Sequence, residues 1–263
     1  MTELVVLEHP LSPYAQKVKL ALHFKGLPFE VRQPAIGADA DAFVRASPRA
    51  EVPVLEVDGV PLYQSSVIGQ FVEERWPEPA MMAGDAMQRA QQRLLEDAID
   101  THFEANTWGL GELRFFGRGT GEEVERLRAH AREQILGWFA WLEDRLGDAS
   151  WFAGAGYGWA DMCVVPFANG AGRFDLVPPR GSKLEAWLAR VNDRDDVALV
   201  RSLAEAAELD PELMRAALEA GFKREYRDHR LEWMVRGGGL DVVRRGLADG
   251  NIRFNSFFDK RVE

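Results

Sequence analysis

The stretch VPVLEVDGVPLYQSS, residues 52–66, holds two short apolar runs on either side of a turn signal. The runs Val54–Val57 and Val60–Tyr63 flank Asp58-Gly59, a dipeptide that favours the positive φ angles of a two-residue hairpin turn. From Ser66 to Arg75 the apolar residues then recur at helical spacing. The stretch therefore predicts a β-hairpin followed directly by a helix that packs on the sheet.

Toward the N-terminus the chain predicts a second group of strands and helices. Leu4–Leu7 is a continuous apolar run, which suits a strand buried on both faces. Helical spacing begins at Tyr14, and Gly26 is a natural stop for that helix. Phe29–Arg32 resumes as a strand, so this part predicts a right-handed βαβ unit. Together with the hairpin and its helix, it predicts a compact α/β, thioredoxin-like domain.

Residues 76–85 contain prolines and a glycine without any period, and they predict a linker. Beyond it the pattern is helical only. The expected helices are Ala86–Thr107, Glu122–Leu146, Trp159–Ala171, Ser182–Val191 and Val197–Ala207. Because a strand-rich unit precedes a helical one, we predict a domain over residues 1–78 and an all-α domain over residues 86–207. Residues 208–263 predict a helical extension, with one helix from Asp210 to about Arg236 and another over Leu240–Ala248.

Composition narrows the class of protein. The formal net charge is −10, which argues against nucleic acid and against an anionic membrane surface as partners. No apolar run approaches the ~18 residues of a membrane span, and the N-terminus lacks the pattern of a signal peptide. The single cysteine, Cys163, excludes an internal disulfide and a CxxC pair. We expect a soluble cytoplasmic protein and no metal, since the five histidines lack metal-ligand spacing.

Three short signals carry the candidate chemistry. Ser12-Pro13 has the form of a serine N-cap followed by proline in the first turn. Pro53 enters a strand, where it suits an edge or first position, and its bond to Val52 is either the commoner trans form or cis. Gln64-Ser65-Ser66 opens a helix, whose free N–H groups favour a carboxylate.

These signals resemble motifs of the glutathione transferase superfamily. The run Ser47–Leu55 resembles the stretch that carries its cis-proline, and Ser12–Leu20 resembles its cysteine-class motif with serine substituted. Tyr157–Met162 resembles the capping motif of its helical domain, with Gly158 where a hydroxyl residue is usual. The resemblance covers residues 3–78 closely and 86–207 loosely. It implies the two-domain fold of glutathione S-transferases, here with a C-terminal helical extension.

The resemblance also implies a site and a function. Glutathione is the expected co-substrate, with its sulfur activated by Ser12 or Tyr14 and its backbone held along Val52 and Pro53. Its γ-glutamyl end is expected at Gln64 and Ser65, and its glycyl carboxylate at Arg49. The expected activity is glutathione transfer to a small hydrophobic electrophile by a homodimer. The alternatives are another glutathione-dependent enzyme (an isomerase, dehalogenase or etherase) and a non-catalytic binding protein of the same fold.

Several other residues have a structural and a functional interpretation. Asp97 and Asp100 lie on the first long helix, where acids are ordinarily solvated but where dimers of the superfamily offer an acid to the γ-glutamyl amine. Cys163 is expected to be a core thiol. Aromatic residues of the helical domain are more often core than lining of an acceptor pocket: Trp108, Phe115, Phe116 and Phe174.

Overall fold

The computed structural model describes residues 2–34, 40–117, 119–207, 210–220 and 240–249. Residues 1–210 form one compact unit and residues 211–263 a second. In the second unit the structure describes α10 (Pro211–Glu219) and α12 (Leu240–Ala248). The rest of the predicted helix to Arg236 and the last residues, 250–263, lie outside the described residues. The boundaries predicted at residues 78, 86 and 208 stay a prediction.

A four-stranded sheet begins the compact unit, in the order β2-β1-β3-β4. Its strands are β1 (Leu4–Leu7), β2 (Glu30–Arg32), β3 (Val54–Val57) and β4 (Val60–Tyr63). β1 pairs in parallel with β2 and antiparallel with β3, which in turn pairs antiparallel with β4. The predicted hairpin is confirmed, with Asp58 at φ 49° and Gly59 at φ 81° in its turn.

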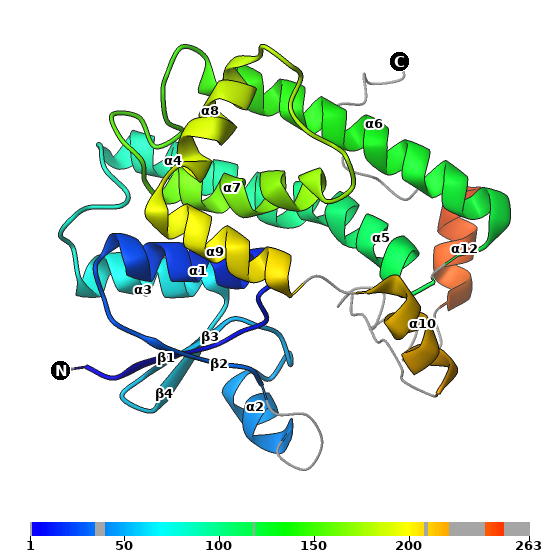
Figure 1. Ribbon diagram of the computed structural model, residues 1–263, viewed down its shortest axis with the longest axis horizontal. Coiled ribbons are helices and arrows are strands. Elements are labelled where there is room, and N and C mark those ends of the chain that lie inside the picture. Colours follow the sequence, from blue (N-terminus) through cyan, green and yellow to red (C-terminus); the bar gives the residue numbers. More distant parts are fainter. Residues whose placement is uncertain (1, 35–39, 118, 208–209, 221–239, 250–263) are drawn as a thin grey trace. The chain divides into compact units, whose positions relative to one another are not determined.

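Three helices accompany the sheet: α1 (Pro13–Phe24), α2 (Ala40–Ala46) and α3 (Ser65–Arg75). Helix α1 lies beside α3, and it also contacts two helices of the following domain, α7 and α9 (Figure 1). The predicted stop of α1 is confirmed, because Gly26 has a φ of 64° and its N–H donates to the His23 carbonyl at 2.9 Å. Helix α1 therefore joins the sheet to the helical domain.

The remainder of the compact unit is helical (Figure 1). Its elements are α4 (Ala86–Ala98), a π-helical turn η1 (Ile99–Phe103), α5 (Glu104–Phe115), α6 (Gly121–Leu146), α7 (Trp159–Gly172), α8 (Lys183–Asn192) and α9 (Asp195–Ala206). The first predicted helix was too short, because α4, η1 and α5 run on to Phe115. A π turn inside a helix is rare and is common at functional sites.

The start of α7 is fixed by the buried carboxylate of Asp161. It accepts the backbone N–H groups of Phe152, Ala153 and Gly158 at 2.9, 3.2 and 3.1 Å. It also accepts the indole N–H of Trp187 at 2.8 Å. Gly158 is the N-cap and offers no side-chain cap, as its type predicts. Cys163, on the same helix, is buried, which confirms the core thiol.

Candidate functional site

The sheet register brings the three signals to one end of the sheet. Leu7 at the end of β1 pairs with Val54 at the start of β3, and Val54 pairs with Tyr63 at the end of β4. Ser12 follows the first of these residues, Pro53 precedes the second and Gln64 follows the third. Segments far apart in the chain are therefore brought to the same end of the sheet.

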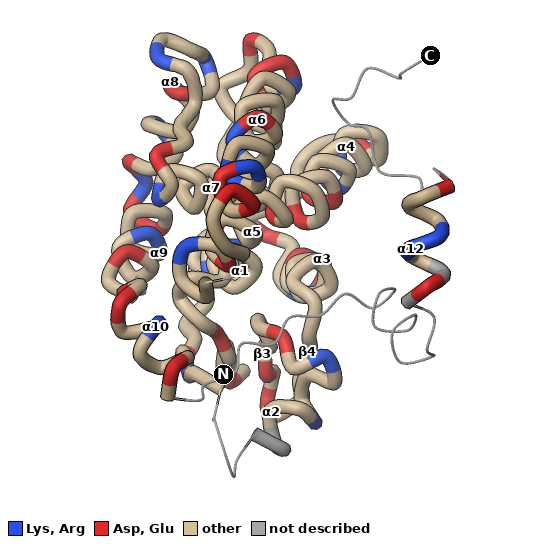
Figure 2. Tube along the Cα trace, turned by 90° about the vertical axis from the view of Figure 1, so that its right-hand side faces the viewer, with Lys and Arg blue, Asp and Glu red and all other residues tan. Residues whose placement is uncertain are grey.

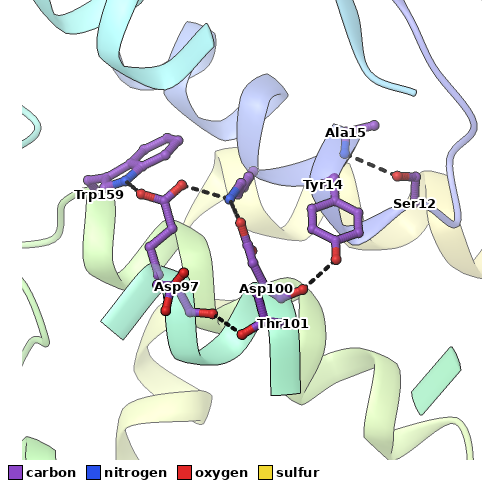
Figure 3. Close-up of polar contacts among 9 residues, drawn as sticks. Ser12, Tyr14, Ala15, Asp97, Asp100, Thr101 and Trp159 are labelled. Atoms are coloured by element: carbon purple, nitrogen blue, oxygen red, sulfur yellow. Dashed lines mark hydrogen bonds and ion pairs between the residues drawn. The ribbon is translucent and has the colours of Figure 1, made fainter. Parts of the chain in front are cut away.

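Ser12 is the N-cap of α1. Its Oγ accepts the Ala15 N–H at 3.3 Å, and its own N–H donates to the His9 carbonyl at 2.8 Å (Figure 3). A hydroxyl has two acceptor lone pairs and one proton. Because the cap uses a lone pair only, the Ser12 O–H can still donate a hydrogen bond to a bound group. The side chain is half-buried, and α1 presents the positive end of its dipole beside it.

Two buried contacts hold the loop that carries Ser12. Glu8 directly follows β1 and pairs with Lys19 of α1 at 2.9 Å, and both side chains are almost fully buried. Gln16 Nε2 donates to the Pro10 carbonyl at 2.9 Å. The loop between β1 and α1 is thus fixed at both ends, which sets the position of the Ser12 hydroxyl.

Tyr14 is directed away from the sheet, into the contact between the domains. Its hydroxyl donates to the Asp100 carbonyl at 2.5 Å, and its ring makes an edge contact with Phe167, with centroids 5.6 Å apart (Figure 3). Burial, together with the negative charges of Glu104 and Asp100, raises the pKa of Tyr14 well above its usual value. Its proton is engaged and strongly held. Of the two predicted activators, the geometry favours Ser12.

The Val52–Pro53 bond is cis, and Pro53 is buried next to β3. Within the part of the chain that the structure describes, the Val52 backbone makes no hydrogen bond. The preceding turn is closed by Ser47, whose Oγ donates to the Glu51 carbonyl at 2.9 Å and accepts the Glu51 N–H at 3.2 Å. Val52 therefore offers its main chain to a partner that pairs as a strand would.

Arg49 lies on that turn and pairs with the Glu51 carboxylate at 3.0 Å, with about half of each side chain exposed. The guanidinium can reach a second anion from there, because it has five N–H donors. Its predicted contact with the glycyl carboxylate stays a prediction.

The start of α3 is an uncapped helix end. Gln64, not Ser65, is the N-cap, and its side chain makes no capping hydrogen bond. Gln64 has a φ of 71°, which costs a residue other than glycine about 1–3 kcal/mol. The buried Ser65 begins the helix, and no side chain among the described residues accepts a hydrogen bond from the first N–H groups of α3. The strained turn thus presents helix N–H groups where a carboxylate was predicted to bind.

A buried charge network beneath Ser12 was not expected. Lys17, one turn along α1, is fully buried and pairs with Glu96 Oε1 at 2.8 Å and with Asp100 Oδ2 (Figure 3). The Trp159 indole donates to Glu96 Oε2 at 2.8 Å. Burial alone would lower the pKa of Lys17, but the two carboxylates outweigh it and the pKa is raised. The spacing of three residues places Lys17 on the same helix face as Tyr14, but it does not indicate that Glu96 and Asp100 pair with Lys17.

The network corrects the expectation for Asp100. It is not a solvated helix acid, since only 12% of its side chain is exposed and it is ion-paired. Burial raises the pKa of Asp100 to about 6, although Lys17 lowers it. Asp97 is exposed, as expected. Among the aromatic residues, Phe115 is buried and belongs to the core, whereas Trp108, Phe116 and Phe174 are partly exposed. Their role in an acceptor pocket stays a prediction.

Within residues 2–34, 40–117, 119–207, 210–220 and 240–249, no group of three or more His, Cys, Asp or Glu could hold a metal ion. In the same residues no helix is long and apolar enough to cross a membrane.

The protein has a thioredoxin-like sheet with a cis-proline, and a helical domain follows it. The Val52 main chain and the N-terminus of α3 are open to a ligand. Together these features define a class of thiol-peptide-binding proteins. Residues 11–75 match the family model of the glutathione S-transferase N-terminal domain, and residues 94–195 match that of the C-terminal domain. The chain belongs to the glutathione S-transferase family.

Known proteins agree with this assignment. Glutathione S-transferase U28 from Arabidopsis thaliana is 30% identical over 205 residues, which cover 75% of this chain and 88% of that protein. Maleylacetoacetate isomerase from Pseudomonas aeruginosa is 33% identical over 192 residues, covering 69% and 86%. The solved structure of rice GST1 in complex with glutathione has a TM-score of 0.66 and 27% identity, and covers 82% of this chain and 97% of that one.

Proposed function

We propose that this protein activates the thiol of glutathione and transfers its sulfur to a small hydrophobic electrophile. The observation that carries the proposal is the sheet register. It brings the segments that hold Ser12, the free Val52 main chain and the uncapped start of α3 to one end of the sheet. The γ-glutamyl carboxylate would lie at Gln64 and Ser65, and the peptide along Val52 and Pro53. The glycyl carboxylate would lie near Arg49.

The chemistry asked of Ser12 is modest. A thiol with a pKa of about 8.5 must ionise near neutral pH, and each unit of lowering requires ~1.4 kcal/mol of differential stabilisation. A hydrogen bond from a hydroxyl to a charged group contributes about 1.5–3 kcal/mol, and a helix N-terminus adds about 0.3–1 kcal/mol. Serine cannot form a mixed disulfide, so the proposed chemistry is thiolate activation and not disulfide exchange.

The test is the variant Ser12→Ala. We expect the pKa of the bound glutathione thiol, followed by its ultraviolet absorbance, to rise by about one unit or more, because at least ~1.4 kcal/mol of stabilisation is lost. Conjugation to chlorodinitrobenzene should slow in parallel. Ser182→Ala is a matched control, because Ser182 caps α8 with a similar hydrogen bond, to the Glu185 N–H at 3.0 Å. An unchanged thiol pKa in Ser12→Ala would refute the role of Ser12.

A second activity is favoured by one relative. The similarity to maleylacetoacetate isomerase supports a glutathione-dependent isomerase that uses the same thiolate. A screen of glutathione conjugation, isomerisation and ether cleavage separates these activities. Glutathione binding without turnover in any of them would instead favour the non-catalytic alternative.

We further propose that the protein is a cytoplasmic homodimer. Large apolar side chains are exposed on β4, α3 and α4, which lie on one side of the compact unit (Figure 2): Val60, Tyr63, Val67, Met87 and Leu94. An apolar surface of this kind commonly marks a protein interface. Light scattering after size-exclusion chromatography tests the dimer, and Val67→Asp should shift it toward monomer. A monomeric wild type would refute this assignment.

A further inference from the structure

The π turn η1 is a feature that the proposed thiol chemistry does not use. It joins α4 to α5 over Ile99–Phe103. A π turn holds one residue more than an α-helical turn, because its hydrogen bonds join residues five apart and not four. One helical residue turns the chain by about 100°, so α5 faces about 100° away from where an uninterrupted α-helix would direct it. The turn thus sets which side of α5 faces the rest of the molecule.

The two helices beside η1 are held by buried apolar side chains. Helix α4 buries Leu95 and Ala98, and α5 buries Leu110 and Phe115. Neither helix could turn by such an angle without exposing these side chains, and the exposure of buried apolar surface is unfavourable. Both helices therefore keep their orientation, and the extra residue stays between them at η1.

Helix α1 holds the middle of this turn through one residue, Asp100. The Tyr14 hydroxyl donates to the Asp100 main-chain carbonyl at 2.5 Å (Figure 3), and Lys17 pairs with Asp100 Oδ2. The other carboxylate oxygen, Oδ1, is buried and has no hydrogen-bond partner among the described residues. Lys17 Nζ also lies 5.8 Å from the centre of the Tyr14 ring and 5.5 Å from that of Trp159. Asp100 is therefore held from α1 by its main chain and by its side chain.

Other carbonyl groups of the same segment receive local donors. Thr101 Oγ1 donates to the Asp97 carbonyl at 2.5 Å, and Asn106 Nδ2 donates to the His102 carbonyl at 2.8 Å. Each of these bonds spans four residues of one continuous helical segment, so it ties the segment to nothing else. Tyr14 donates from the domain that contains the sheet, and its bond therefore fixes η1 against that domain.

The two ends of this contact lie next to the two halves of the proposed reaction. Tyr14 is two residues from Ser12, which is proposed to activate the sulfur. Helix α5 begins directly after η1 and carries Trp108, and Phe116 is its C-cap. Both are partly exposed and were predicted to line an acceptor pocket. A movement of η1 against α1 would therefore shift the predicted acceptor residues relative to the sulfur.

We propose that Tyr14 is a positioning residue for the acceptor: its hydroxyl holds η1, and through η1 the helix α5, in the arrangement that sets a hydrophobic acceptor against the sulfur. The inference rests on the proposed function. Tyr14 is not asked to touch the sulfur or the acceptor. Without its hydroxyl, fewer molecules hold η1 in that arrangement, and the apparent affinity for the acceptor falls by the same fraction.

The experiment measures binding, so it does not depend on turnover. Calorimetry compares the affinity for glutathione with that for S-dinitrophenylglutathione, and the ratio of the two gives the contribution of the acceptor group. In Tyr14→Phe we expect the conjugate to bind about fivefold more weakly, the factor that corresponds to one net hydrogen bond. The affinity for glutathione and the pKa of its bound thiol should stay unchanged. Hydrogen exchange of the backbone N–H groups over residues 99–107 should accelerate by about the same factor.

Two variants serve as controls. Tyr157→Phe also removes a buried tyrosine hydroxyl, but this one has no hydrogen-bond partner among the described residues. The Tyr157 ring packs on Phe24 and Trp151, with centroids 6.0 and 5.7 Å apart. Ser182→Ala removes the cap hydrogen bond of α8 and so lowers stability without touching η1. Neither variant should change the ratio of the two affinities.

The possible outcomes separate the role of Tyr14 from the proposed function. An unchanged affinity for the conjugate in Tyr14→Phe overturns the positioning role. An equal loss for glutathione and the conjugate, or a raised thiol pKa, overturns it too, because Tyr14 then acts at the thiol itself. So does a wild type that binds the conjugate no more tightly than glutathione, since the acceptor group is then not held. If the ratio falls as expected but the wild type converts no electrophile, the transferase function fails and the role of Tyr14 stands.

Discussion

Replacing Lys17 by methionine tests whether the buried charge network holds α1 against the helical domain. Methionine keeps most of the volume and removes the cation, so Glu96 and Asp100 are left buried without it. Breaking a buried pair in this way costs about 3–5 kcal/mol, because the remaining charge is no longer compensated. For a domain of this size each kcal/mol lowers Tm by roughly 2–4 °C, so we expect a loss of about 6–20 °C.

The pH dependence gives the prediction its sign. Burial already raises the pKa of Asp100 to about 6, so between about pH 4 and pH 6 the folded protein holds a proton that the unfolded chain has lost. Without Lys17 the pKa of Asp100 rises further, and the penalty is fully present above that pKa. It is relieved as the pH falls and the carboxyl becomes neutral. We therefore expect the stability difference between wild type and Lys17→Met to shrink from pH 8 to pH 5.

Urea denaturation followed by tryptophan fluorescence measures the difference at each pH. Lys183→Met is the matched control, because Lys183 pairs with Asp148 at 2.6 Å but both side chains are largely exposed. Exposed pairs contribute little to stability, so this variant should unfold as the wild type does. A loss for Lys17→Met no larger than for Lys183→Met, or a loss that does not vary with pH, would refute the reasoning.

Two further substitutions test single contacts. Tyr14→Phe removes only the hydrogen bond to the Asp100 carbonyl, so stability should fall by about 1 kcal/mol while the pKa of the bound thiol stays unchanged; a raised thiol pKa would return Tyr14 to the role of activator. Gly158→Ala places a Cβ 2.6 Å from the Met81 carbonyl oxygen and should cost about 1–3 kcal/mol in thermal unfolding, whereas Gly170→Ala on the same helix meets nothing within 4 Å and should be neutral or stabilising.

Much of the fold could be predicted because its signals are local. The Asp58-Gly59 turn fixes β3 and β4 through the φ angles it allows, and Gly26 ends α1 in the same way. The helices of the second domain follow from apolar periodicity. The π turn at Ile99–Phe103 could not be found by that means, because one turn of different pitch barely alters a pattern of period 3.6.

Some residues of the site also have local sequence signals, and others do not. Ser12 and Pro53 carry recognisable signals at helix and strand ends. Helix α3 begins at Ser65, one residue before the predicted Ser66, and its N-cap Gln64 has a φ of 71° that no local signal indicated. Asp100 looked like any acid inside the predicted helix Ala86–Thr107, and only its ion pair with Lys17 from another segment distinguishes it.

The sequence by itself determined the order of the strands and of every helix it predicted, because turn, cap and periodicity signals act within a few positions, but it did not predict α2. The resemblance of its motifs supplied the family and the residues expected to face the sulfur. Only the tertiary structure decided which buried charged groups pair with one another. Lys17 meets Glu96 and Asp100, 79 and 83 positions away, and Tyr14 meets the Asp100 carbonyl 86 positions away. The state of a buried charge depends on its solvent exclusion and its partners, and neither is a property of the local sequence.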